Sequence, residues 1–351
     1  MNVLVTGSAG YIGAHATLRL LREGHTVIGV DNLFRGHQAA MDLVAKATNA
    51  GNRLQFTVGD INDTALLRSL IAKHKAEAVL HFAARAYVGE SVDMPLAYFR
   101  ANTAGTVSLL EACAAEGVQR LVFSSSCSTY GEPPPERIPV SEECPQSQMS
   151  PYGRSKFQCE QMIRDFAEGA RRAKKPFAWR ALRYFNVAGC DRTGVVGEDH
   201  TPETHIIPII LQAALGQRPH VSVFGTDYPT PDGTCIRDYI HVDDLVDAHV
   251  KVLAALKPEV PATEAAHTPA YNLGIGKGFS VRQVIDAARK VTGREIKVVE
   301  APRRAGDPPL IYANAAKIRA ELGWTASVQT IDEIIETAWK WFAGHPRGYR
   351  G

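Results

Sequence analysis

A tyrosine and a lysine four residues apart, Tyr152 and Lys156, are the side chains of this sequence best suited to acid–base chemistry. They fall at the start of a helix predicted to end near residue 170, where residues four apart emerge from one face. An isolated tyrosine has a pKa of about 10, too high for a base at neutral pH. A nearby ammonium group favours the phenolate and lowers that pKa. This spacing alone is more typical of surface residues, so the catalytic interpretation depends on the rest of the chain.

A glycine-rich turn near the N-terminus predicts a site for a dinucleotide diphosphate. Residues 2–6 are typical of a strand, and Gly7, Gly10 and Gly13 then lead into an amphipathic helical pattern. Glycines let the backbone approach a pyrophosphate, which the first N–H groups of the helix bind. The spacing Gly-x-x-Gly-x-x-Gly is a weak signal without this context.

An aspartate at the end of the second predicted strand indicates which dinucleotide is bound. The strand covers 26–30, and Asp31 follows it directly. A carboxylate there accepts hydrogen bonds from the ribose hydroxyls and repels a 2′-phosphate. The sequence therefore predicts NAD rather than NADP. The alternative is a solvated loop aspartate.

Strands and helices alternate through the first half of the chain, which predicts an α/β fold with a Rossmann-like doubly wound parallel sheet. In such sheets ligands bind beyond the carboxyl ends of the strands. Further strands are predicted at 54–58, 78–82, 120–124 and 179–186, and helices at about 37–48, 63–73 and 94–116. The residues at the strand ends include Asn32, Asp60, Ile61, Phe82, Ala83, Ala84, Ser124 and Ser126.

Together these features predict hydride transfer at a secondary alcohol. Bound NAD carries a positive nicotinamide ring, a second cation that lowers the pKa of Tyr152. The Tyr152 phenolate would take the hydroxyl proton while Ser126 orients the oxygen. The hydride of the C–H bond would pass to NAD.

The regular alternation ends near residue 187, which predicts a second domain. Residues 1–186 are expected to form the NAD-binding domain, rejoined by about 235–256, and 187–351 mainly a smaller α/β substrate lobe. In the lobe we expect helices at 204–216, 280–292, 314–321 and 331–343, with short strands at 221–224, 271–273 and 297–299.

The composition excludes several classes of protein. A net charge of +2 over 351 residues gives no electrostatic case for nucleic acid or an anionic membrane surface. No apolar run approaches the roughly 20 residues that span a bilayer, and the N-terminus lacks the regions of a signal peptide. The six cysteines form no C-x-x-C pair, and His200 and His205 lack an obvious third ligand. We expect a cytoplasmic protein without a metal.

Motifs along the whole chain resemble those of the extended short-chain dehydrogenases and, within them, the UDP-hexose 4-epimerases of the UDP-glucose/UDP-galactose type. The segments that carry the resemblance are 5–13, 31–32, 81–84, 88–91, 124–126, 150–153, 182–186, 232–234, 237–241 and 302–304.

The resemblance implies an epimerisation at C4 of a UDP-sugar through a transient 4-keto sugar, with no net oxidation. The UDP supplies most of the binding energy, while the 4-keto sugar rotates in the site to present its other face. Arg237 and Arg304 would pair with the diphosphate through their forks of donors. The resemblance also implies a homodimer formed through the helices at about 94–116 and 152–170.

The implied contacts are as follows. NAD would touch Gly7, Gly10, Tyr11, Ile12, Gly13, Asp31, Asn32, Asp60, Ile61, Phe82, Ala83, Ala84, Asn102, Ser124, Tyr152, Lys156 and Phe185. The UDP-sugar would touch Ser126, Tyr152, Asn186, His205, Ile206, Val223, Phe224, Arg237, Tyr239, Arg304, Asp307 and Ile311.

Three departures from the family pattern bear on the substrate and the chemistry. Ala86 stands where many members have a lysine near the nicotinamide, so the local positive charge is reduced. Cys127 follows the serines, with no histidine nearby in sequence to activate it. Ile311, intermediate in volume, stands where relatives have a bulky tyrosine or a small residue, which leaves N-acetylated sugars open.

Alternative activities remain. Segments 127–133 and 233–238 also resemble epimerases of UDP-xylose and UDP-arabinose, and a UDP-N-acetylglucosamine 4-epimerase is a further alternative. A nucleotide-sugar dehydratase needs an acid and a base after the serines, whereas 127–129 are Cys, Ser and Thr. A non-enzymatic NAD-binding protein typically lacks the catalytic tyrosine or lysine, and both are present.

Overall fold

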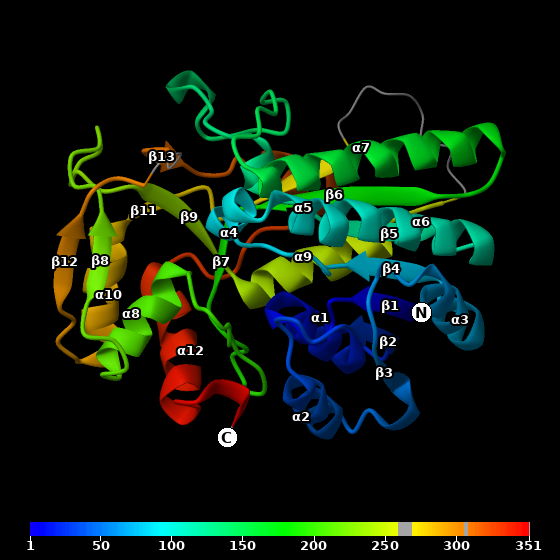
Figure 1. Cartoon of the computed structure of the whole chain (residues 1–351), viewed down its shortest axis with the longest axis horizontal. Coiled ribbons are helices and arrows are strands. Elements are labelled where there is room, and N and C mark those ends of the chain that lie inside the picture. The colour runs from blue at the N-terminus through cyan, green and yellow to red at the C-terminus, as the bar shows by residue number, and fades with distance from the viewer. Residues whose placement is uncertain (259–268, 305–307, 351) are drawn as a thin grey trace. The chain divides into compact units, whose positions relative to one another are not determined.

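A computed structural model of the chain describes residues 1–258, 269–304 and 308–350 (Figure 1). The chain clusters into two compact units. The first comprises 1–131, 145–183 and 246–271, and the second 132–144, 184–245 and 272–351. Residues 132–144, which the sequence analysis included in the first domain, thus cluster with the second unit.

The first unit is built on a seven-stranded sheet, which confirms the predicted Rossmann-like fold. The order is β10-β6-β5-β4-β1-β2-β3, and neighbours from β6 to β3 pair in parallel. Val3, Leu4 and Val5 of the central strand β1 are fully buried, as expected for a parallel strand covered on both faces. The strands are β1 (Asn2–Thr6), β2 (Thr26–Asp31), β3 (Leu54–Val58), β4 (Ala78–His81), β5 (Arg120–Ser124), β6 (Ala178–Tyr184) and β10 (Ala270–Leu273).

Helices cover both faces of this sheet (Figure 1). On one face α6 packs against α3 and α7. On the other, α1 packs against α2, and Arg19 of α1 pairs with Asp247 of α9 at 2.8 Å. The helices are α1 (Tyr11–Arg22), α2 (Gln38–Thr48), α3 (Thr64–His74), α4 (Val88–Asp93), α5 (Pro95–Tyr98), α6 (Gly105–Glu116), α7 (Pro151–Arg172) and α9 (Val242–Ala255).

The single helix predicted over 94–116 is divided in the structure. Pro95 begins the short helix α5, a π-helical segment covers Phe99–Ala104, and α6 begins at Gly105. Proline favours the first helical position because its missing N–H is not needed there. The π segment contains Asn102, one of the predicted NAD contacts, and such segments are frequent at functional sites.

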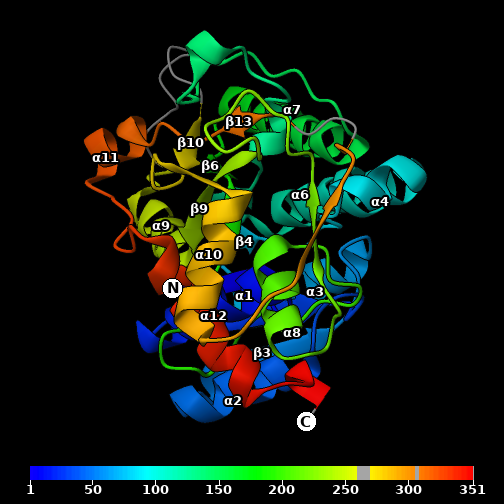
Figure 2. The same ribbon diagram turned by 90° about the vertical axis from the view of Figure 1, so that its left-hand side faces the viewer.

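The second unit has its own sheets and its own core. β9 pairs with β7, β11 and β13, β12 pairs with β8, and α8, α10 and α12 lie side by side (Figure 2). The strand predicted over 179–186 ends at Tyr184, and Asn186 begins β7. β9 lies in the segment 235–256 that was expected to rejoin the first domain, and it clusters with the second unit. The elements are β7 (Asn186–Ala188), α8 (Ile206–Ala214), β8 (Val221–Phe224), β9 (Ile236–His241), β11 (Gly278–Ser280), α10 (Val281–Thr292), β12 (Val298–Ala301), β13 (Leu310–Ile311), α11 (Ala316–Leu322) and α12 (Ile331–Gly344).

Candidate active site

The glycine turn joins β1 to α1 and brings the backbone close to the end of β4. Gly7 has a φ of +71°, and a Cβ there would lie 2.6 Å from the Ala83 nitrogen. A Cβ at Gly13 would lie 1.9 Å from the Gly7 carbonyl oxygen. Gly10 is the N-cap of α1, and a glycine brings no side-chain oxygen to the N–H groups of the first turn. The turn therefore fits a diphosphate bound at the helix N-terminus.

Asp31 lies buried at the end of β2, as predicted. Its carboxylate accepts hydrogen bonds from the backbone N–H of Ala9 at 3.0 Å and of Leu33 at 2.8 Å. Burial raises the pKa of Asp31, and the backbone N–H groups of Leu33, Ala9 and Gly10 counteract that rise. Each carboxylate oxygen accepts more than one hydrogen bond. Asp31 therefore holds the glycine turn and keeps acceptor capacity for ribose hydroxyls.

Two more predicted cofactor residues meet at the ends of β2 and β3. The Asn32 side chain donates to Asp60 Oδ2 at 2.7 Å, and Asp60 Oδ1 accepts the backbone N–H of Asn62 at 2.9 Å. Burial acts to raise the pKa of Asp60, but the hydrogen bonds from Asn62 and Asn32 outweigh it and lower the pKa. Asp60 is therefore held as a carboxylate beside Ile61, which is buried.

The end of β4 is tied to the end of β1. The N–H groups of Phe82 and Ala83 both donate to the Thr6 carbonyl, at 3.0 and 3.1 Å. Asn102 holds the following loop, because its amide donates to the Arg85 carbonyl at 3.0 Å and to Ser155 Oγ at 2.9 Å. Both N–H groups of this amide are thus used within the protein. The predicted NAD contact of Asn102 would have to use its oxygen or its apolar atoms.

Tyr152 and Lys156 occupy the first two turns of α7, as predicted, and both are buried. The Ser150 hydroxyl caps this helix by accepting the N–H of Gly153 at 3.1 Å, and Pro151 is the first helical residue. Lys156 Nζ donates to the Ser124 carbonyl at 2.8 Å and lies 4.9 Å from the centre of the Phe123 ring. Burial lowers the pKa of Lys156 to about 8, although Cys159 and Glu160 oppose the shift.

The serines that follow β5 are held in three different ways. Ser124 Oγ lies 2.9 Å from His249 Nε2, and Ser125 Oγ donates to the Glu160 carboxylate. Ser126 Oγ accepts the backbone N–H of Ser128 at 3.1 Å, which leaves its own hydroxyl proton available for donation. The role predicted for Ser126, as a donor to a substrate oxygen, is compatible with this contact and stays a prediction.

A buried ion pair that is not predicted from the sequence lies behind these residues. Arg183 of β6 donates from Nε to Glu160 Oε1 at 2.9 Å and from Nη1 to the Tyr130 hydroxyl at 3.0 Å. Glu160 follows Lys156 by one helical turn, so the spacing of 152, 156 and 160 on one buried face was the available signal. The pair joins α7 to β6 and, through Ser125, to the end of β5.

In the second unit the predicted substrate residues gather around β9. Arg237 and Tyr239 are two apart on this strand and therefore point to one side. Arg237 is in register with Ile311 of β13, and Tyr239 with Asn186 of β7. Four residues distant in sequence thus lie on adjacent strands.

A second group in this unit lies at β8. The Arg304 guanidinium stacks over the Phe224 ring at 3.8 Å. Val223 of the same strand is buried in the core. Asp307 lies outside the described residues. Phe185 is buried, and its N–H donates to the Leu273 carbonyl at 3.3 Å.

His205 and Ile206 lie where α8 begins, and the structure supplies what the sequence did not show there. His205 is the N-cap residue of α8, and its Nδ1 lies 2.8 Å from Glu203 Oε1. In the sequence, His200 and His205 have no obvious third ligand. The structure brings Glu198 and Glu203 to both histidines.

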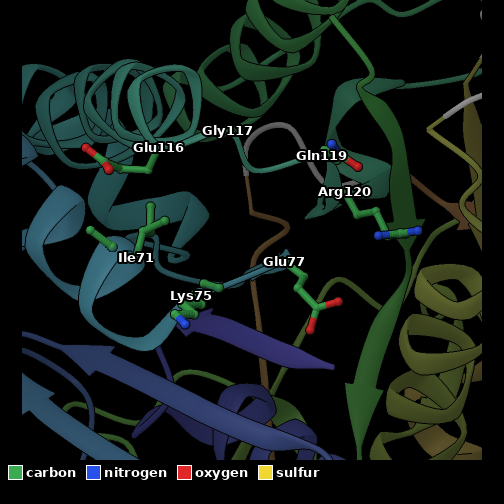
Figure 3. A pocket seen from close by; sticks show the side chains of 9 residues that line it. Ile71, Lys75, Glu77, Glu116, Gly117, Gln119 and Arg120 are labelled. Atoms are coloured by element: carbon green, nitrogen blue, oxygen red, sulfur yellow. The ribbon is translucent and has the colours of Figure 1, made fainter.

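A hollow of about 380 Å³ lies beside the amino-terminal ends of β4 and β5, away from the carboxyl ends where the predicted site residues lie (Figure 3). Two of its charged side chains form hydrogen bonds to the backbone: Glu77 accepts the N–H of Asn2 at 3.0 Å, and Arg120 donates to the Leu256 carbonyl at 3.2 Å. None of the predicted site residues lines it.

Comparisons with known proteins agree with this geometry. Residues 3–274 match the model of the NAD dependent epimerase/dehydratase family. The chain is 46% identical over 352 residues to a UDP-arabinose 4-epimerase of Arabidopsis thaliana, covering 99% of this chain and 81% of that protein. It is 44% identical over 351 residues to a UDP-glucose 4-epimerase of Lacticaseibacillus casei, covering 99% of each. The UDP-glucose 4-epimerase of Bifidobacterium longum, solved with NAD+ and UDP, superimposes with a TM-score of 0.90 at 38% identity over 99% of this chain and 100% of that one.

Proposed function

Because this chain belongs to the NAD dependent epimerase/dehydratase family, we propose that it inverts the configuration at C4 of a UDP-sugar, with UDP-glucose and UDP-galactose as its substrate pair. The observation that carries this function is the buried pair Tyr152 and Lys156 on α7 beside the end of β5. The cofactor is NAD, which accepts a hydride from the sugar carbon and returns it. The glycine turn and Asp31 fit its diphosphate and ribose.

The residues of the first unit supply the acid–base chemistry. Tyr152 removes the proton of the C4 hydroxyl as the C–H bond breaks, which leaves a ketone at C4. It then returns a proton to the oxygen when the C–H bond re-forms on the other face. Lys156, protonated below a pKa of about 8, stabilises the phenolate. Ser126 donates a hydrogen bond to the reacting oxygen.

The residues of the second unit bind the nucleotide part of the substrate. Arg237 and Arg304 pair with the diphosphate, since a guanidinium offers donors in a fork that matches phosphate oxygens. The stacking of Arg304 on Phe224 orients its guanidinium without using its donors. Because UDP supplies most of the binding energy, the sugar itself can be held loosely enough to rotate and present its other face.

A second candidate substrate pair is UDP-xylose and UDP-arabinose. The relative from Arabidopsis thaliana that is 46% identical is a UDP-arabinose 4-epimerase. A pentose in its pyranose form lacks the C6 hydroxymethyl group, so it places the same ring without that substituent beside the same acid–base pair. The C4 chemistry is the same for both pairs.

The test is a panel of UDP-sugars followed by NMR without added cofactor. We expect UDP-glucose to be converted to an equilibrium mixture with UDP-galactose, and UDP-xylose to be converted more slowly. Faster conversion of UDP-xylose would assign the enzyme to the pentose pair. Conversion of neither pair would contradict the proposed function.

The proposed oligomer is a homodimer formed, as the resemblance implies, through the helices at about 94–116 and 152–170, which correspond to α5, α6 and α7. Apolar side chains are exposed on or directly before α5 and α6, including Leu96, whose exposed fraction is 80%, with Val92, Met94 and Val107. We expect the protein to sediment as a dimer and Leu96→Asp to sediment as a monomer. Val299→Asp is the matched control, because Val299 is an exposed apolar residue of the second unit. A monomeric native protein would rule out the dimer.

The proposed compartment is the cytoplasm. None of the six cysteines, which all lie among the described residues, forms a disulfide, as is usual for proteins of reducing compartments. No helix among the described residues is long and apolar enough to cross a membrane. Fractionation of cells that produce the protein tests this compartment: we expect the protein in the cytoplasmic fraction, and its recovery in another fraction would contradict the proposal.

A further inference from the structure

Four side chains in the segment before α8 converge on one point. Glu198, His200, Glu203 and His205 each contribute one ligand atom, and these atoms all lie within 4.8 Å of one another. The two carboxylates are almost completely buried, with side-chain exposures of 3% and 2%. The proposed reaction does not use this cluster, although His205 also stands among the predicted substrate contacts.

The spacing of these atoms differs from that of ordinary hydrogen bonds. Glu198 Oε1 lies 3.3 Å from Nδ1 of both histidines, and His200 Nδ1 lies 3.5 Å from Glu203 Oε2. Hydrogen bonds between nitrogen and oxygen prefer about 2.7–3.2 Å. Around a tetrahedral ion with bonds of about 2.0–2.1 Å, neighbouring ligand atoms lie roughly 3.3–3.4 Å apart. Three of the four ion-pair distances therefore approach the edge of such a tetrahedron.

The fourth contact is a hydrogen bond that metal binding would replace. His205 Nδ1 lies 2.8 Å from Glu203 Oε1. That same carboxylate oxygen also accepts the backbone N–H groups of Thr204 and His205, each at 2.8 Å. The Glu203 carboxylate is thus oriented by the backbone N–H groups of the two residues that follow it. Metal ligands are usually supported by further hydrogen bonds of this kind.

The chemistry of the ligands selects the class of ion. Imidazole nitrogen suits zinc and its neighbours in the transition series, whereas magnesium and calcium prefer oxygen ligands alone. Two carboxylates and two neutral imidazoles carry a formal charge of −2, which a divalent cation neutralises in this largely buried place. The His205 side chain is 41% exposed and offers an entry path.

From this geometry we propose that Glu198, His200, Glu203 and His205 form a structural site for a divalent transition-metal ion, with Zn²⁺ as the best match. Four protein ligands close the coordination sphere, as is usual for structural rather than catalytic zinc. The ion would join residues 198–205 and fix the segment that leads into α8. In its absence the same four groups pair as acids and bases.

The experiment measures metal binding by the untagged protein. After dialysis against a chelator, Zn²⁺ is titrated by calorimetry, and Co²⁺ is added separately to record its visible spectrum. We expect one Zn²⁺ per chain, the intense visible bands of tetrahedral Co²⁺, and a higher Tm with Zn²⁺ because the ion binds the folded state.

His200→Gln removes one ligand and is expected to weaken Zn²⁺ binding at least ~10-fold and to abolish the Tm shift. His220→Gln is the matched control in the same unit, outside the cluster, and should bind as the native protein does. Glu203→Gln is a second test in case the first variant folds poorly, as judged by circular dichroism. The site is ruled out if native protein binds Zn²⁺ no more tightly than His200→Gln, or if Co²⁺ shows only a weak octahedral spectrum. These readouts are independent of epimerase activity.

Discussion

Tyr152 is the residue on which the proposed reaction depends most directly. Substitution Tyr152→Phe removes one oxygen and keeps the ring, which packs edge-to-face with Tyr98 at 6.4 Å. We expect turnover to fall by at least ~100-fold, the low end of what a general base contributes, while NAD remains bound. The measurement is the rate of UDP-galactose conversion together with the absorbance of retained cofactor. Tyr98→Phe is the control, and unchanged turnover in Tyr152→Phe would remove the acid–base role.

Lys156 carries a cost in stability that depends on pH. Its pKa in the fold is about 8, below the ordinary 10.5, because burial penalises the ammonium. Above pH 10.5 Lys156 is neutral in both the folded and the unfolded protein, so its burial carries no charge penalty. As the pH falls from 10.5 to 8, the unfolded state binds the proton first and the folded protein loses stability relative to it. We therefore expect Lys156→Met to be more stable than the native protein near pH 7, by about 3 kcal/mol at most, and this difference to shrink toward pH 10.

Urea denaturation at several pH values measures this difference. Lys175→Met is the control, because Lys175 is exposed and its replacement should give no pH-dependent difference. Turnover by Lys156→Met should be low at every pH, since the phenolate of Tyr152 loses its neighbouring cation. A difference in unfolding free energy that is constant with pH would show that Lys156 is not the titrating group.

Ile311 is the residue at which the size of the substrate can be tested. It is buried on β13 in register with Arg237. A tyrosine there adds volume beside a proposed diphosphate contact. We expect Ile311→Tyr to reduce turnover of UDP-N-acetylglucosamine more than that of UDP-glucose. Ile311→Val is the control, and equal losses for both sugars would place the selection elsewhere.

At the scale of elements, the catalytic helix α7 is fixed by an ion pair rather than by apolar packing alone. Arg183 and Glu160 are both almost fully buried, with side-chain exposures of 1% and 2%. Breaking a buried pair leaves one uncompensated charge and costs about 3–5 kcal/mol. Arg183→Met should therefore destabilise the protein by this amount, as measured by urea denaturation.

The double variant Glu160→Leu/Arg183→Met separates charge from shape. It removes both charges, so it should recover much of the lost stability. Turnover should stay low in the double variant, because Ser125 loses its acceptor and the end of β5 loses one of its two connections to α7, keeping only the bond from Lys156 to the Ser124 carbonyl. Full recovery of turnover would show that the pair has a purely structural role.

At the scale of the whole molecule, the described residues of the two units form separate hydrophobic clusters. One is centred on the large sheet and contains Leu4, Leu121 and Phe123; the other contains Val221, Ile334 and Trp341. Each unit thus has a core of its own, so unfolding need not be a single two-state transition.

Retention of NAD is also a property of the whole molecule. The epimerase returns its hydride in every turnover, so it has no need to exchange the cofactor. We expect the purified protein to carry NAD and to turn over without any added. Removing the cofactor should lower the Tm, since NAD binds only the folded protein. Differential scanning calorimetry with and without NAD measures the change. Strict dependence on added NAD would indicate a dehydrogenase instead.

The sequence alone determined the architecture of the first unit and the class of cofactor, and it was sufficient to propose the acid–base pair. These depend on local signals: Gly7 through Gly13 between a strand and a helix, Asp31 after the second strand, and Tyr152 and Lys156 one turn apart. The interruption of the helix at 94–116 was partly foreseeable from Pro95, whereas its π segment was not.

Only the tertiary structure decided which distant residues act together. Arg183 lies 23 positions from Glu160 and in another element, so their pairing follows from packing, not from spacing. Asn186, Tyr239, Arg237 and Ile311 became neighbours through strand pairing, which periodicity cannot predict. Glu198 and Glu203 met His200 and His205 because an irregular segment folds back on itself, and irregular backbone has no repeating pattern to read. The proposed acid–base pair could therefore be located from the sequence, while the buried ion pair behind it and the four-residue cluster had to be seen in three dimensions.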